Sequence, residues 1–192
     1  MSARRALVDA AKASVAKGLN HGAVGNLSLR RPDGQGMLIT PSGLEPEAIR
    51  PRDIVSMDWT GTWAVKAEGR RPSSEWRFHR DILVARPDFG AVVHAHPVSA
   101  TALAVHGLGI GPFHYMVALA GGRDIRCAGY ATFGTQALSD LVLAALEGRR
   151  ACLMAHHGLI ACGSDLASAL SLAVEVEQLA ATYVAARCFG EP

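Results

Sequence analysis

Three histidines and one glutamate are the residues whose types and spacing point to chemistry. His94 and His96 stand two positions apart in a short apolar run, and residues at i and i+2 of a strand face the same side. Two imidazoles on one face can bind one metal ion, and His156-His157 offers a third ligand. Three histidine ligands leave a coordination position open, as in catalytic zinc sites. Glu75 would then be the general acid or base beside the metal.

Each of these residues also has a simpler interpretation. A single strand histidine is usually a core or surface residue, and a carboxylate at a helix start is usually explained by the helix dipole. Adjacent strand residues face opposite ways, so only one of His156 and His157 can join the site, and the pattern does not say which. The other would be a supporting or core histidine. The pair of histidines on one face of a strand favours the metal site.

Small and polar residues cluster at three places where strands or helices are expected to begin or end. Backbone N–H groups and hydroxyls at such places can bind an anion, above all at a helix N-terminus. Each cluster alone is more often a turn, but together they suggest a phosphate pocket. Its candidate residues are Gly25, Asn26, Ser42, Gly43, Ser73 and Ser74. The chain has no glycine motif of the P-loop or dinucleotide-binding type, which argues against a nucleotide fold.

Composition limits the classes of protein to which the chain can belong. Its 192 residues, 49% of them hydrophobic, suffice for one domain over 1–192 with a sizeable core. The net charge of +2 favours neither nucleic acid nor an anionic membrane as partner. No apolar run is long enough to span a membrane, and residues 1–5 lack a signal-peptide pattern, so a cytoplasmic location is expected. The four cysteines form no CxxC pair and should be free thiols.

The hydrophobic pattern predicts one α/β domain, with helices on the faces of a central, mostly antiparallel sheet. A helix over 3–18 precedes an antiparallel meander of four strands, expected at 27–30, 36–40, 54–58 and 62–66. Another helix starts at 72–75 with Glu75 in its first turn, and the strand 91–96 carries the paired histidines. The remaining expected elements are helices at 98–105, 137–145 and 165–187 and strands at 151–155 and 159–162.

The motifs, taken in order along the chain, resemble the class II aldolase and adducin-head family. The match is carried by residues 25–30, 38–43, 73–79, 92–96, 114–116, 130–135 and 156–162. Within the family it is most similar to the aldolases that cleave ketose 1-phosphates such as L-fuculose 1-phosphate. The resemblance implies an α/β/α sandwich and a role in carbohydrate metabolism. The expected reaction splits a phosphorylated sugar into dihydroxyacetone phosphate and an aldehyde.

The resemblance also assigns roles to residues by position. It implies one zinc ion per subunit, held by His94, His96 and His157, with Glu75 as the acid/base. Tyr115 matches a tyrosine that reaches the site of a neighbouring subunit, so a homotetramer with shared active sites is expected. The phosphate ligands implied are Asn26, Ser42, Gly43, Ser73 and Ser74.

Other functions share this fold, and the family aldolases have one feature that the sequence lacks. Pentulose-5-phosphate 4-epimerases carry an acidic residue near the Tyr115 stretch, but 113–117 has none. Sugar-acid phosphate decarboxylases could use the same metal chemistry. Adducin-like heads are non-catalytic interaction modules without the full set of histidines. The aldolases also carry a further tyrosine beyond the last helix, near the substrate aldehyde, which Tyr183 does not obviously replace. The identity of the aldehyde product is therefore left open.

Overall fold

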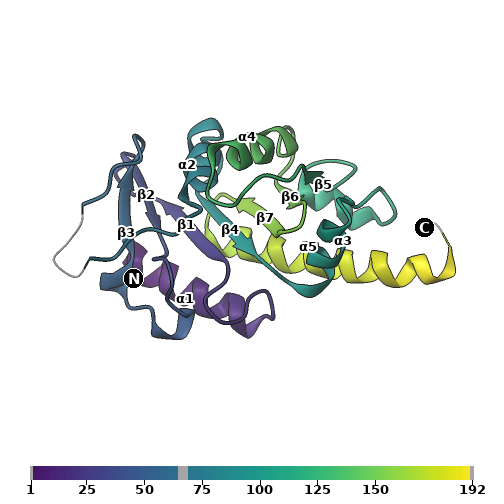
Figure 1. Ribbon diagram of the computed structural model, residues 1–192, viewed down its shortest axis with the longest axis horizontal. Helices are drawn as coiled ribbons and strands as arrows, with labels where there is room; N and C mark the ends of the chain where they lie inside the picture. Colours follow the sequence, from purple (N-terminus) through teal and green to yellow (C-terminus); the bar gives the residue numbers. More distant parts are fainter. Residues whose placement is uncertain (1, 65–68, 191–192) are drawn as a thin grey trace.

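A seven-stranded sheet runs through the middle of the molecule (Figure 1), with the strand order β3-β2-β1-β4-β7-β6-β5. The computed structural model describes residues 2–64 and 69–190. Neighbouring strands are antiparallel except β5 and β6, which confirms the mostly antiparallel sheet. The strands are β1 (Asn26–Arg30), β2 (Gly36–Ile39), β3 (Val55–Asp58), β4 (Ala91–Ala95), β5 (Arg126–Ala128), β6 (Ala151–Met154) and β7 (Gly158–Gly163).

Helices cover both faces of the sheet, so the α/β/α sandwich is confirmed (Figure 1). One face packs against α1 (Ala3–Ala16), α3 (Val98–Val105) and α5 (Leu166–Ala186). The other face packs against α2 (Trp76–Ala85) and α4 (Gln136–Ala145). Short 3₁₀ segments lie in the connections, η1 (Pro46–Ala48), η2 (Pro51–Asp53) and η3 (Tyr115–Ala120), and a fourth, η4 (Arg187–Phe189), follows α5.

Strand β4 lies at the centre of the sheet and divides its side chains between the two cores. Ala91, Val93 and Ala95 pack in the core under α1, α3 and α5, whereas Val92 packs in the core under α2 and α4. This alternation is the period of two expected of a strand buried on both faces. It places His94 on the same side as Val92, toward α2.

Local signals explain where the long helices begin. The hydroxyl of Ser2 accepts a hydrogen bond from the backbone N–H of Arg5 at the start of α1. Asp165, the N-cap residue of α5, accepts a hydrogen bond from the N–H of Ser168. The hydroxyl of Ser168 in turn accepts from the N–H of Asp165, so α5 starts with a reciprocal capping box. Among the helices that the structure describes, none is both long and apolar enough for a membrane span.

The structure corrects three details of the predicted elements. Helix α2 begins at Trp76, so Glu75 is its N-cap residue and does not lie in the first turn as predicted. The strand β5 was not predicted, because three residues carry too little pattern. Of the expected strand at 62–66, Trp63 makes only an isolated bridge to Met57, and 65–68 lie outside the described residues.

Candidate functional site

Strand β4 brings two histidines to one point. His94 is fully buried and lies opposite Asn26 of β1 and Ile160 of β7, while His96 follows the end of the strand and is half-buried. The Nδ1 of His94 is 2.9 Å from the backbone oxygen of Leu159 and must donate to it, since a carbonyl only accepts. The lone pair of neutral His94 is therefore on Nε2, which is 2.8 Å from Nε2 of His96.

The third histidine comes from the turn between β6 and β7. The N–H of His157 donates to the carbonyl of Met154 at 3.0 Å, and His156 between them has a φ of 57°. A positive φ at this position is the geometry of a type II turn, so the prediction that strand alternation separates the two histidines was wrong. The turn directs His157 toward His94 and His96. His156 is exposed with its ring edge-on to Tyr130, so it is neither a core nor a supporting histidine.

A glycine lets this turn approach β4. A Cβ on Gly158 would lie 2.4 Å from the backbone oxygen of Ala95 and 2.9 Å from the ring of His96. No side chain fits there without moving backbone atoms, so Gly158 permits the close contact between the two ends of the site. The ring centroids of His94, His96 and His157 are consequently only 4.6–4.9 Å apart.

The donor set and its surroundings fit a metal ion. One ring nitrogen from each of His94, His96 and His157 lies within 4.8 Å of the others. The carboxylate of Glu75 faces them, with Oε2 3.2 Å from Nε2 of His94 and Oε1 3.2 Å from Nε2 of His157. Oε1 is buried and has no hydrogen-bond partner among the described residues, a costly state that a nearby cation would relieve. Three nitrogens and a carboxylate around one point are typical ligands and neighbours of zinc.

Burial and charge shift the protonation of these groups. Burial lowers the pKa of His96 to about 3, which keeps its imidazole in the neutral form that binds metals. Burial also works to raise the pKa of the Glu75 carboxyl. Attraction to the charged form of His94, with a smaller contribution from His157, outweighs it and holds this pKa well below its usual value. Glu75 is therefore an anion at the floor of the site.

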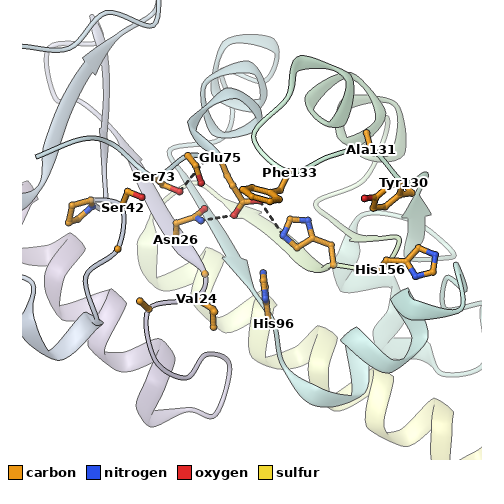
Figure 2. Close-up of a pocket in the computed structure, with 16 residues that line it drawn as sticks. Val24, Asn26, Ser42, Ser73, Glu75, His96, Tyr130, Ala131, Phe133 and His156 are labelled. Atoms are coloured by element: carbon orange, nitrogen blue, oxygen red, sulfur yellow. Dashed lines mark hydrogen bonds and ion pairs between the residues drawn. The ribbon is translucent and has the colours of Figure 1, made fainter.

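A cavity of about 400 Å³ opens above these groups (Figure 2). All six residues predicted to bind phosphate line it, as do Glu75, His96 and His157. They meet because the segment after β2 pairs with the segment before α2. The N–H of Ser73 donates to the carbonyl of Thr40, and the N–H of Ser42 donates to that of Arg71, both at 3.0 Å.

Two predicted site residues are not among those that line the cavity of their own chain: His94, which is fully buried, and Tyr115. Tyr115 begins the 3₁₀ turn η3, and 82% of its side chain surface is exposed. Tyr115 is therefore not buried in a core strand.

Sequence reasoning missed the cavity wall formed by the loop that follows β5 (Figure 2). Tyr130 and Phe133 are 67% and 64% exposed, although large aromatic side chains are usually buried, and Ala131 lies between them. Arg77 of α2 donates to the carbonyl of Gly134 at 2.6 Å and ties this loop to the helix behind Glu75. The sequence feature that could have indicated this wall is a pair of aromatic residues within a segment of turn-forming residues.

Known proteins resemble the chain over nearly its whole length. Residues 5–184 match the model of the family described as class II aldolase and adducin N-terminal domain. A 5-methylthioribulose-1-phosphate/5-deoxyribulose-1-phosphate aldolase of Rhodospirillum rubrum is 56% identical over 98% of this chain and 83% of its own. An L-fuculose phosphate aldolase of Escherichia coli K12 is 47% identical over 98% and 85%. A solved L-fuculose 1-phosphate aldolase superposes with a TM-score of 0.94, at 41% identity, over 100% and 90%.

Proposed function

We propose that this chain, which belongs to the class II aldolase and adducin N-terminal domain family, is a zinc-dependent aldolase acting on a ketose 1-phosphate. The products would be dihydroxyacetone phosphate and an aldehyde. The observation that carries the proposal is the meeting of His94, His96, His157 and Glu75 at the floor of a cavity rimmed by the serine and glycine clusters.

The three histidines would hold the metal, and a divalent ion bound there would act as a Lewis acid toward the substrate oxygens. When the carbon–carbon bond breaks, the hydroxyl on the aldehyde side loses a proton and the carbon of the dihydroxyacetone phosphate fragment gains one. Glu75 is buried beside the histidines and is the group proposed to hold and deliver that second proton. In the synthetic direction the same carboxylate would remove it.

The serine and glycine clusters are proposed to bind the phosphate. Ser73 and Ser74 precede Glu75, the N-cap residue of α2, and a helix N-terminus favours an anion. Gly43 has a φ of +71° with open space around its Cβ position. The turn at Ser42-Gly43 lies beside Ser73 and Ser74, because the segments 40–42 and 71–73 are paired by backbone hydrogen bonds. Binding energy from the phosphate, which does not react, would hold the reacting carbons beside Glu75.

The cavity wall made by Tyr130, Ala131 and Phe133 favours a substrate whose aldehyde portion ends in an apolar group. The relative from Rhodospirillum rubrum is named for two pentulose 1-phosphates that end in a methyl or a methylthio group. Aromatic carbon against such a group gains hydrophobic contact, whereas L-fuculose 1-phosphate, although it also ends in a methyl group, carries on C5 a hydroxyl that would lose water there. We therefore propose 5-deoxy- and 5-methylthio-pentulose 1-phosphates as substrates ahead of L-fuculose 1-phosphate.

A panel of ketose 1-phosphates tests this function, with dihydroxyacetone phosphate measured by a coupled dehydrogenase. We expect kcat/KM for 5-deoxyribulose 1-phosphate to exceed that for L-fuculose 1-phosphate by about ten-fold or more, the usual discrimination of an apolar pocket. Equal or reversed preference would contradict the substrate class. Release of an epimer or of carbon dioxide from the matching sugar phosphates, without dihydroxyacetone phosphate, would contradict the aldolase reaction itself.

The second proposed catalytic residue is Tyr115, acting in the site of a neighbouring subunit. Tyr115 is exposed to solvent, and so are the apolar side chains of Val105, Leu108 and Leu119. Exposed apolar side chains often mark a protein interface. In a cyclic homotetramer each site would take Glu75 from one subunit and Tyr115 from the next. The tyrosine hydroxyl would exchange a proton with the aldehyde oxygen.

We expect Tyr115→Phe to lower turnover by about ten- to a hundred-fold with unchanged metal content, since only the hydroxyl is lost. Mixing this variant with Glu75→Gln after dissociation should restore activity at about one quarter of sites, where a neighbour supplies the intact partner residue. Sedimentation should show four chains. A fully active monomer, or no restoration on mixing, would refute the shared site.

A further inference from the structure

A buried hydrogen-bond chain leads from strand β1 to Glu75. The Asn26 Nδ2 donates to Oε2 of Glu75 at 2.9 Å, and the Asn26 Oδ1 is hydrogen-bonded to Nε2 of His79. The other ring nitrogen, Nδ1 of His79, is 2.8 Å from the hydroxyl oxygen of Ser28. The exposed fraction is 0% for Ser28 and His79 and 6% for Asn26, so water does not substitute for these bonds. A chain of three residues, two of them remote in sequence from Glu75, thus ends at its carboxylate.

The fold explains why they meet. Asn26 and Ser28 stand two residues apart on β1, so both side chains face the α2 layer, as does His94 opposite Asn26. His79 is on the buried face of α2, one turn after Glu75, and extends its ring between the two β1 side chains. The same helix therefore carries both the carboxylate and the imidazole that reaches it through Asn26.

The negative charge on Glu75 determines which group donates and which accepts in each hydrogen bond of this chain. An ionised carboxylate only accepts, so the NH₂ group of Asn26 must face Glu75 and its oxygen must face His79. The Nε2 of His79 must then carry a hydrogen. Burial lowers the pKa of His79 to about 3, so the ring is neutral, has no second hydrogen, and accepts at Nδ1 from the Ser28 hydroxyl. A flipped Asn26 amide would place oxygen against carboxylate and N–H against N–H.

We propose that Ser28 and His79 are positioning residues that hold the Asn26 amide in the orientation that binds Glu75. This inference rests on the proposed function, because it takes Glu75 as the acid/base. Since Oε1 lacks a hydrogen bond among the described residues, the bond to Oε2 is what orients the carboxylate within the protein. A small displacement of a catalytic group is costly, and groups behind an active site typically change activity by about 10- to 100-fold.

The test compares Ser28→Ala and His79→Phe with two other variants. His79→Gln retains an N–H that can reach Asn26 and should recover activity. Ser139→Ala is the matched control, because Ser139 is also 0% exposed and its hydroxyl donates to Asp81 at 2.6 Å, away from the site. Each variant is assayed for cleavage of the ketose 1-phosphate, for metal content and for Tm. Deuterium exchange into dihydroxyacetone phosphate in D₂O, followed by NMR, reports proton transfer at carbon without bond cleavage.

We expect kcat and the exchange rate to fall together, by about 3- to 10-fold in Ser28→Ala and about 30- to 100-fold in His79→Phe, with KM and metal content nearly unchanged. His79→Gln should stay within about 5-fold of wild type, and Ser139→Ala should lower only Tm. If His79→Phe does not fold, the comparison of the two serine variants decides. Equal losses in Ser28→Ala and Ser139→Ala would overturn the positioning role. A wild-type protein that neither cleaves nor exchanges would instead overturn the proposed function.

Discussion

Glu75→Gln is expected to keep the fold and the metal but to lose about two to four decades of turnover, the size typical of a general acid/base. Glutamine has nearly the same shape, and its amide oxygen can still accept the bond from Asn26 that now ends at Oε2. It cannot hold a proton for transfer to carbon. The loss should therefore appear in kcat and in deuterium exchange into dihydroxyacetone phosphate, while Tm changes little.

Glu47→Gln is the matched control for this experiment. The side chain of Glu47 is 69% exposed and contacts Lys12 on the outer side of α1, so its replacement removes one negative charge far from the cavity. An exposed pair of this kind contributes little to stability. The control should retain wild-type kcat. If Glu75→Gln also stayed within a few-fold of wild type, Glu75 would not be the acid/base.

Removal of the metal is expected to abolish turnover, with a loss of more than about a thousand-fold that added Zn²⁺ restores. The protein purified without chelators should contain about one zinc per chain, measured by elemental analysis. His157→Ala should lose the metal, because three nitrogen ligands become two. The neighbouring His156→Ala should retain it, because that exposed ring points toward Tyr130 and away from the group of three.

The double variant His94→Ala, His96→Ala gives the most direct test of the proposed metal site. Both rings contribute a nitrogen to the group of three, and together they supply the only two ligands that come from β4 and its end. Full metal occupancy in this variant would show that the ion binds elsewhere. Restoration of activity to the chelated wild type by another divalent ion, but not by Zn²⁺, would overturn the choice of zinc while leaving the histidine site in place.

The sequence by itself determined those features that depend on local pattern. The period of two in β4 predicted that His94 and His96 share one face, and in the structure their ring centroids lie 4.6 Å apart. Asp165 and the long apolar pattern after it predicted α5 and its start. The three clusters of small polar residues were found because glycine and serine at element ends have a recognisable turn and capping chemistry.

Only the tertiary structure decided which of these features meet and how they are oriented. His157 was separated from His156 by a turn with positive φ, which no alternation rule describes. Glu75 is the N-cap residue of α2, but its carboxylate makes no capping bond to the helix backbone and contacts the histidines and Asn26 instead. The hydrogen-bond chain through His79, like the wall of Tyr130 and Phe133, joins segments far apart in sequence. Such contacts depend on how strands and helices pack, and the pattern within any one segment carries no information about its partner.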